Sequence, residues 1–329
     1  MKFQSIVRWT AIASIAILTS ACGMQAAPGM QAAPAQVIGA LNSEGKPPEY
    51  EKIFPQAYRP QPYPVKVIAH RGYSKAAPEN TLSAIQAAID AGADAIEFDI
   101  RLSKDGHPVV IHDASVNRTT NGDGKVSKMT LAELQQLDAG SWFDPKFKGE
   151  RIPTLEEALL LMRGKATPVI EVKVSSQAIA RPLADTLKRL DMTRHAYVTT
   201  FYAGPLNALK SLAPELSRAV LVTPIASPTG RALDMRAGTS QAYHRSLERN
   251  DVDRAHSLGL QVHAWTVNQV QDMHEMIELG IDGITTDEVT ALRQVLKERF
   301  PGKPPVNPHS LWGRLYPIDR DDTTKVGIY

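Results

Sequence analysis

From residue 65 to residue 300 the chain alternates short apolar runs with amphipathic segments, and this alternation constrains its fold more than any other feature. The apolar runs predict buried strands, and apolar residues at helical spacing between them predict helices. Eight predicted strands end near His70, Asp99, His112, Lys173, Thr200, Val222, Val267 and Thr286. Eight strands joined mostly by helices predict an α/β protein with a closed (β/α)8 TIM barrel.

The alternation breaks between the second and third predicted strands. No helix fits there, and Asp105-Gly106 predicts a tight turn. We therefore expect a hairpin that brings His112 beside Asp99. The next stretch, 113–150, is too long for a simple connection and predicts an inserted subdomain after the third strand. The stretch 223–245 fits neither pattern and stays ambiguous.

Three aromatic residues stand close together near the end of the insertion: Trp142, Phe143 and Phe147. We expect them to form the insertion's small core rather than a surface that docks on lipid.

The N-terminus predicts export and lipidation. Lys2 and Arg8 precede an apolar run, 9–18, that is too short to span a bilayer comfortably. Residues 18–23, Leu-Thr-Ser-Ala-Cys-Gly, resemble the bacterial lipoprotein processing box, so we expect 1–22 to contain the signal and Cys22 to be lipidated. An ordinary secretory peptide is the alternative.

The remaining flanks predict no fold of their own. Residues 23–64 are rich in Ala, Pro and Gln, which is typical of a flexible tether, and residues 301–329 form a Pro-rich tail. We expect a lipid-anchored domain of the bacterial cell envelope that faces the periplasm. Gly23 is not the Asp that usually retains lipoproteins in the inner membrane, which favours the outer membrane.

The charge balance argues against nucleic-acid partners. Lys2 and Arg8 account for the formal net charge of +2, so the rest of the chain is neutral. Binding to nucleic acid requires a basic surface that replaces phosphate counterions.

Polar side chains collect where the predicted strands end, which is the end of a β/α barrel that carries active sites. Glu97 and Asp99 share one face of a strand because their spacing is two, and Glu171 lies near the end of another strand. Three carboxylates suit Ca²⁺ or Mg²⁺ better than zinc. Paired carboxylates also occur in glycosidases, but His70 and His112 favour metal-assisted chemistry with proton transfer by imidazole.

An ordered set of motifs resembles the glycerophosphodiester phosphodiesterase family. These are His-Arg-Gly at 70–72, Pro-Glu-Asn-Thr at 78–81, Glu-Phe-Asp at 97–99, His-Asp at 112–113, Arg-Thr-Thr at 118–120, Glu-Val-Lys at 171–173 and Trp-Thr-Val-Asn at 265–268. The resemblance covers 65–300. It implies a phospholipase-C-like barrel that uses a divalent metal to hydrolyse glycerophosphodiesters to sn-glycerol 3-phosphate and an alcohol.

The resemblance also implies roles for individual residues. They are acid/base catalysis for His70 and His112, metal binding for Glu97, Asp99 and Glu171, phosphate contacts for Arg71 and Lys173, a wall of the substrate pocket for Trp265, and a place at or directly behind the metal for Glu79 and Asn268. Lys173 has an alternative role as a simple ion-pair partner of Glu171.

Two other functions remain open at this point. One is a lysophospholipase D or sphingomyelinase D-like phospholipase on the same scaffold. The other is a non-catalytic, lipid-anchored protein that binds glycerophosphodiesters.

Overall fold

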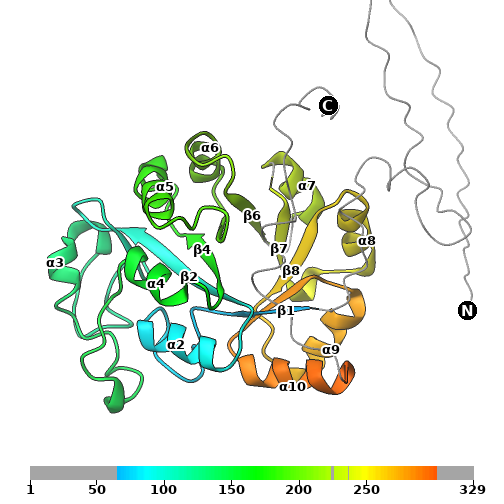
Figure 1. Cartoon of the computed structure of the whole chain (residues 1–329), viewed down its shortest axis with the longest axis horizontal. Helices are drawn as coiled ribbons and strands as arrows, with labels where there is room; N and C mark the ends of the chain where they lie inside the picture. Colours follow the sequence, from blue (N-terminus) through cyan, green and yellow to red (C-terminus); the bar gives the residue numbers. More distant parts are fainter. Residues whose placement is uncertain (1–64, 224–225, 236, 302–329) are drawn as a thin grey trace, which may run out of the picture. The chain divides into compact units, whose positions relative to one another are not determined.

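Eight parallel strands close into a barrel in the computed structural model, which describes residues 65–223, 226–235 and 237–301 (Figure 1). The ring closes because β1 pairs with both β9 and β2. In spatial order the barrel strands are β1 (Lys66–Ala69), β2 (Ala95–Leu102), β4 (Thr167–Val172), β5 (Tyr197–Thr200), β6 (Ser217–Val222), β7 (Thr239–Tyr243), β8 (Gln261–Trp265) and β9 (Gly283–Thr286). The predicted TIM barrel is confirmed.

The membership of the ring differs from the prediction. The strand predicted to end near His112 is β3 (Pro108–Val110), which runs antiparallel to β2 and, among the strands that the structure describes, pairs with β2 alone. A strand that follows a tight turn must run antiparallel to its neighbour, so it cannot belong to a parallel barrel. The barrel strand that the sequence did not predict is β7, whose sequence Thr-Ser-Gln-Ala-Tyr contains no apolar run.

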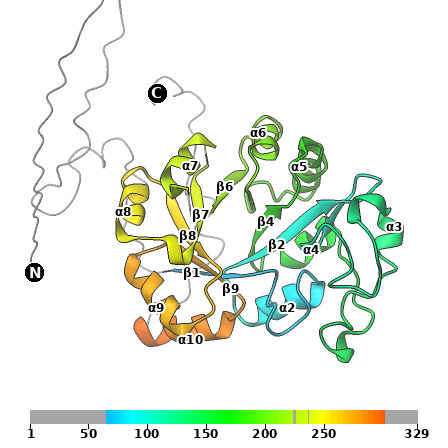
Figure 2. The ribbon, with the colours of Figure 1, turned by 180° about the vertical axis from the view of Figure 1, so that it is seen from behind.

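Helices cover the outside of the barrel, as opposite views show (Figures 1 and 2). They are α2 (Leu82–Asp90), α4 (Leu155–Met162), α5 (Ala180–Arg189), α6 (Ala203–Leu212), α7 (Pro228–Asp234), α8 (Arg249–Ser257), α9 (Val270–Leu279) and α10 (Val289–Arg299). Local sequence sets several of their ends. Thr81 caps α2 by accepting the N–H of Ala84, and Thr154 forms a capping box with Glu157 at the start of α4.

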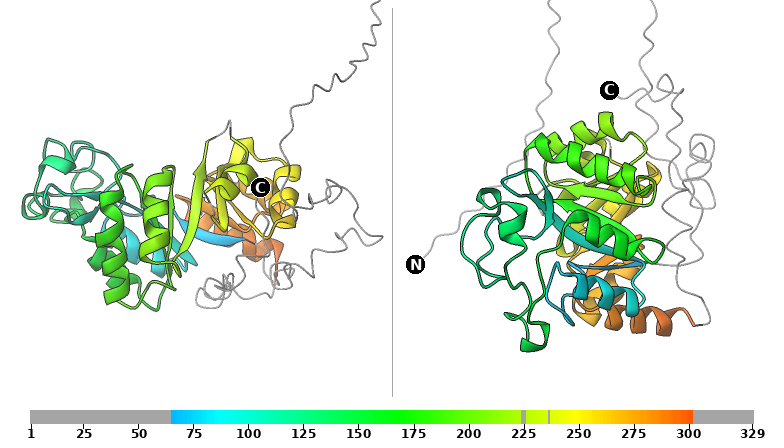
Figure 3. Two further views of the ribbon diagram at one scale, coloured as in Figure 1. Left: turned by 90° about the horizontal axis from the view of Figure 1, so that it is seen from above. Right: turned by 60° about the vertical axis from the view of Figure 1, so that its left-hand side comes forward.

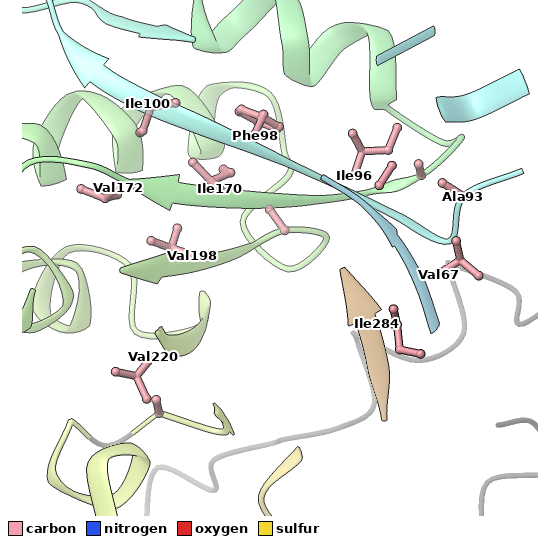
Figure 4. Close-up of a cluster of buried hydrophobic side chains, with 14 of the residues drawn as sticks. Val67, Ala93, Ile96, Phe98, Ile100, Ile170, Val172, Val198, Val220 and Ile284 are labelled. Atoms are coloured by element: carbon pink, nitrogen blue, oxygen red, sulfur yellow. The ribbon is translucent and has the colours of Figure 1, made fainter. Parts of the chain in front are cut away.

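The main apolar core lies between the strands and the helices. Figure 4 shows Phe98 and Ile100 of β2 beside Ile170 and Val172 of β4 in this layer. Side chains alternate along a strand, so outward-facing Phe98 places its neighbours Glu97 and Asp99 inside the barrel. The core packing thereby determines which polar groups face the interior.

The segment that follows β3 projects from one side of the barrel and contains α3 (Leu131–Leu134) (Figure 3). It has a separate apolar cluster of Val109, Ile111, Val116, Val126, Leu134, Ala139 and Ile152. The predicted aromatic core is wrong: Trp142 is 40% exposed, and it contacts Phe143, which contacts Phe147, only edge to face. Aliphatic side chains form the core instead, because Val109 of β3 and Ile111, which follows the strand, are apolar and need cover.

Several predictions concern residues outside the described ranges. The export signal, Cys22, the tether 23–64 and all but the first residue of the tail 301–329 belong to this group. Within the described ranges, no helix is both long enough and apolar enough to span a membrane.

Candidate active site

Three buried carboxylates meet where the middle of β2 pairs with the C-terminal half of β4. The register pairs Asp99 with Glu171, and Glu97 lies one inward-facing position before Asp99. One oxygen from each of the three residues lies within 4.8 Å of the other two. The three predicted metal ligands are thus brought together.

This carboxylate trio needs positive charge. Burial and the charge of Asp99 raise the pKa of Glu171 to about 7, and burial with both neighbouring charges raises the pKa of Glu97 well above its usual value. Burial also acts to raise the pKa of Asp99, but the charges of Lys173 and Arg71 outweigh it and lower that pKa. Proximity therefore opposes ionisation of all three at once.

One atom of the trio supports a metal site directly. Oε1 of Glu97 is buried without a hydrogen-bond partner among the residues that the structure describes. A buried oxygen of this kind is costly unless a cation or donor receives it. Hard carboxylate oxygens fit Ca²⁺ or Mg²⁺, so the residues present suit a hard divalent cation.

Two cationic side chains border the trio. Nζ of Lys173 lies 2.5 Å from Oε1 of Glu171 and 3.3 Å from Oδ1 of Asp99, while Nε of Arg71 lies 3.5 Å from Oδ2 of Asp99. The ion pair that the sequence allowed for Lys173 is present. The charges of both side chains act on Asp99, which keeps this buried carboxylate ionised more readily.

The backbone of the His-Arg-Gly motif is shaped around Glu97. Arg71 has a φ of 56°, which turns its N–H toward Oε2 of Glu97 at 2.9 Å, and the N–H of Gly72 donates to the backbone oxygen of Glu97 at 3.0 Å. A Cβ on Gly72 would lie 2.6 Å from the carbonyl carbon of Ala84. Position 72 therefore requires glycine for both its φ of 77° and its close packing.

Asn80 holds Asp99. Asn80 comes just before Thr81, the N-cap of α2, and takes a left-handed conformation with a φ of 59°. Its Nδ2 donates to Oδ2 of Asp99 at 2.8 Å, and its Oδ1 accepts the N–H of Asp99 at 3.0 Å. Asparagine tolerates this conformation better than most residues.

His70 follows β1 and pairs with Asp287, which follows β9. Nδ1 of His70 lies 2.7 Å from Oδ1 of Asp287, and that oxygen also accepts from Ser74. Nδ2 of Asn268 donates to the other oxygen of Asp287 at 2.6 Å. Asn268 therefore acts on Asp287, and lies behind His70 rather than in the carboxylate trio.

His112 also pairs with a carboxylate through Nδ1, as His70 does. The predicted hairpin is confirmed, but its register differs by one residue from the expected pairing. Ile111 rather than His112 lies opposite Asp99 and donates its N–H to the backbone oxygen of Asp99 at 2.9 Å, and His112 comes next in the chain. Nδ1 of His112 lies 2.7 Å from Oδ1 of Asp113. Burial lowers the pKa of His112, although the charge of Asp99 and the bond to Asp113 partly offset this effect.

Glu79 lies between two arginines instead of in the carboxylate trio. Its Oε1 accepts from Nη1 of Arg71 at 2.8 Å, and both of its oxygens accept from Arg118.

At the mouth of the barrel, the edge where its strands end, aromatic side chains come from the ends of β5, β7 and β8. Nε1 of Trp265 donates to the backbone oxygen of Gln241 at 2.9 Å, which fixes the indole. The ring of Trp265 contacts Phe201 and Tyr243 edge to face at centroid distances of 6.1 and 5.8 Å. Ionic groups thus come from β1, β2, β4 and β9, and aromatic groups from β5, β7 and β8.

Four residues in this network were not predicted as site residues: Asn80, Asp113, Arg118 and Asp287. Each belongs to a motif or strand end that the sequence had already marked as polar, so the signal was present. What the sequence lacked was the assignment of partners across the fold.

Known proteins are similar to this chain in sequence and in fold. Residues 70–291 match the model of the glycerophosphoryl diester phosphodiesterase family. A glycerophosphodiester phosphodiesterase of Caldanaerobacter subterraneus is 40% identical over 237 residues, which cover 70% of this chain and 98% of that protein. Another from Bacillus subtilis is 32% identical and covers 71% of this chain and 87% of its own length.

Two solved structures agree with these relatives. An Oleispira antarctica phosphodiesterase in complex with the product sn-glycerol-3-phosphate has a TM-score of 0.67 at 31% identity, over 71% of this chain and 97% of that one. A glycerophosphodiester phosphodiesterase of Agrobacterium tumefaciens has a TM-score of 0.63 at 34% identity, over 70% and 99%. The chain belongs to the glycerophosphoryl diester phosphodiesterase family and is an enzyme of that class.

Proposed function

We propose that the chain hydrolyses glycerophosphodiesters to sn-glycerol 3-phosphate and an alcohol, with Ca²⁺ or Mg²⁺ held by Glu97, Asp99 and Glu171. The observation that carries this proposal is the pair of imidazoles beside a buried carboxylate trio, each bound through Nδ1 to a carboxylate. When bound, the cation supplies positive charge. This charge offsets the negative charge of the phosphoryl oxygens and lowers the pKa of the attacking hydroxyl.

The two histidines divide the proton transfers. With Nδ1 engaged by Asp287 or Asp113, Nε2 is the nitrogen of each ring that exchanges a proton with substrate. One ring takes the proton of the attacking hydroxyl and the other protonates the departing alkoxide. Attack by water gives sn-glycerol 3-phosphate directly, whereas attack by the glycerol 2-hydroxyl gives a cyclic phosphate that water opens in a second step.

The remaining side chains bind and orient the diester. Arg71 and Lys173 contact the phosphate from the ionic side of the mouth, where they already lie beside Asp99. Trp265 forms a wall of the substrate pocket on the aromatic side.

A coupled assay for glycerol 3-phosphate released from glycerophosphocholine tests the proposal. We expect product with Ca²⁺ or Mg²⁺, loss of product with EDTA, and recovery when the cation is restored. H70N and H112N should each lower kcat by about 10²–10⁴-fold, while H107N, at a histidine whose side chain is 56% exposed, should match the wild type.

Each other outcome has a defined meaning. No product with either cation contradicts the proposed reaction, and activity that EDTA leaves unchanged contradicts the metal assignment. Choline release from lysophosphatidylcholine or sphingomyelin, but not from glycerophosphocholine, supports a phospholipase D-type activity. Binding of glycerophosphocholine without turnover supports a non-catalytic binding protein.

We also propose that the domain is anchored to the bacterial cell envelope through lipid on Cys22 and faces the periplasm, on the outer membrane. The support is the processing box at residues 18–23. Radiolabelled palmitate should enter the wild-type chain but not C22S, and membrane fractionation should separate outer from inner membrane. An unlabelled, freely soluble wild-type chain contradicts the anchor.

A further inference from the structure

One guanidinium joins two carboxylates at the rim of the active site. Arg118 donates to both oxygens of Asp113, from Nε at 2.8 Å and from Nη2 at 3.1 Å. It also donates to both oxygens of Glu79, from Nη1 and Nη2, each at 2.8 Å. Four hydrogen bonds from one planar group hold these two carboxylates in a fixed relation.

Each carboxylate holds a proposed functional residue on its other side. Oδ1 of Asp113 lies 2.7 Å from Nδ1 of His112, and Oε1 of Glu79 lies 2.8 Å from Nη1 of Arg71. Arg118 is therefore connected through Asp113 to His112, the imidazole proposed to transfer a proton. It is connected through Glu79 to Arg71, the guanidinium proposed to bind phosphate.

The charges favour a single arrangement of this network. The hydrogen bonds from Arg118 hold the pKa of Asp113 far below its usual range. Burial acts to raise the pKa of Glu79, but the bonds from Arg118 and the charge of Arg71 outweigh it and lower that pKa. An ionised Asp113 only accepts, so the proton of neutral His112 lies on Nδ1, which leaves Nε2 basic.

The loop that carries Arg118 is held independently of the Arg118 side chain. Buried Val116 donates its N–H to the backbone oxygen of Gly124 at 3.0 Å, and Oγ1 of Thr120 donates to the backbone oxygen of Val116 at 2.7 Å. The Arg118 side chain itself is 44% exposed. Its replacement should therefore leave the loop folded.

We propose that Arg118 is a positioning residue of the reaction, which aligns His112 through Asp113 and Arg71 through Glu79. This inference rests on the proposed function. Lysine cannot replace arginine here, because a single ammonium cannot present the fork that grips two carboxylates at once.

The test compares R118A and R118K with R189A. Arg189 makes a similar fork to Glu156 with a side chain that is 55% exposed, so R189A controls for the loss of a surface ion pair. We expect R118A and R118K to lose about 10- to 100-fold in kcat, the range seen when partners behind a site are removed. R189A should match the wild type, and all three should melt close to it.

Two readouts distinguish positioning from a structural role. Added guanidinium chloride at non-denaturing concentration should partly restore R118A but not R189A or wild type, whereas sodium chloride should restore none. The double variant D113N/R118A should lose less than the product of the two single losses, because both changes disturb the connection from Arg118 through Asp113 to His112. Wild-type kcat in R118A, full activity in R118K, or losses that multiply in the double variant would overturn the proposal.

A further readout does not depend on turnover. The Nδ1 proton of His112, identified by its absence in H112N, should give a downfield NMR signal that weakens in R118A and persists in R189A. An inactive wild type with this pattern contradicts the proposed function alone. An unchanged signal in R118A contradicts the positioning of His112 by Arg118.

Discussion

Nδ1 of His70 lies 2.7 Å from Oδ1 of Asp287, although 217 positions separate the two residues in the chain. His70 follows the first barrel strand and Asp287 follows the last, and these strands pair when the ring closes. Burial acts to raise the pKa of Asp287, but hydrogen bonds from His70, Ser74 and Asn268 hold it below its usual range. Closure of the barrel therefore places an ionised carboxylate behind His70.

The D287N variant should lose most of its activity without losing its fold. An amide removes the negative charge and can turn its N–H toward Nδ1, which favours the wrong tautomer of His70. We expect kcat to fall by about 10²-fold or more, since proton transfer by one group contributes about 10²–10⁴-fold. H256Q is the matched control, because it breaks another His–Asp pair, between α8 and Asp282, which precedes β9 and so lies at the other end of that strand from Asp287. Equal kcat in D287N and wild type would argue against His70 as a proton carrier.

The N80G variant should weaken metal binding specifically. Glycine accepts the φ of 59° at position 80, so the substitution removes the two hydrogen bonds to Asp99 without adding backbone strain. We expect about 10- to 100-fold weaker binding of Ca²⁺ or Mg²⁺, measured by calorimetry on the metal-free protein. The reference is N80D, which sets a second negative charge against Asp99 and changes the site electrostatically. Wild-type affinity in N80G would show that the Asn80 amide does not orient Asp99.

Much of the candidate site can be predicted from the local sequence pattern. Glu97 and Asp99 share a face because their spacing is two, and the turn at Asp105-Gly106 predicts the hairpin that delivers His112. These inferences need only neighbouring residues. The barrel is predicted from repeated strand–helix units. The prediction of a barrel therefore holds although one of its eight strands was assigned wrongly.

The remaining features depend on contacts that no local pattern encodes. β7 was missed because Gln241 faces the barrel interior and bonds Tyr197, so this strand lacks the apolar run that marks its neighbours. The pairing of His70 with Asp287 depends on ring closure. The exposure of Trp142 depends on which side chains cover β3.

The G72A variant tests whether close packing of the His-Arg-Gly turn limits stability. Gly92 is a matched control, because it also has a positive φ, 75°, but apart from its chain neighbours no atom of the described residues lies within 4 Å of a Cβ built there. G92A should cost about 1 kcal/mol from backbone strain alone. G72A should cost about 1–3 kcal/mol more, because its Cβ would overlap the backbone of Ala84. Urea denaturation measures both; equal losses would show that the turn relaxes to admit a methyl group.

The pair of His256 and Asp282 predicts how stability changes with pH. Nε2 of His256 lies 2.8 Å from Oδ2 of Asp282. Burial alone would lower the pKa of His256, but the hydrogen bond and charge of Asp282 outweigh it and raise that pKa. A raised histidine pKa stabilises the fold fully below the unfolded value, about 6.5, and this contribution is lost as pH rises through the folded value. The free energy of unfolding should therefore be higher in wild type than in H256Q. This difference should be largest at about pH 5–6 and should shrink toward pH 9. H107Q, at an exposed histidine, controls for loss of an imidazole. A difference between wild type and H256Q that stays constant or grows with pH would mean that the ion pair does not stabilise the barrel.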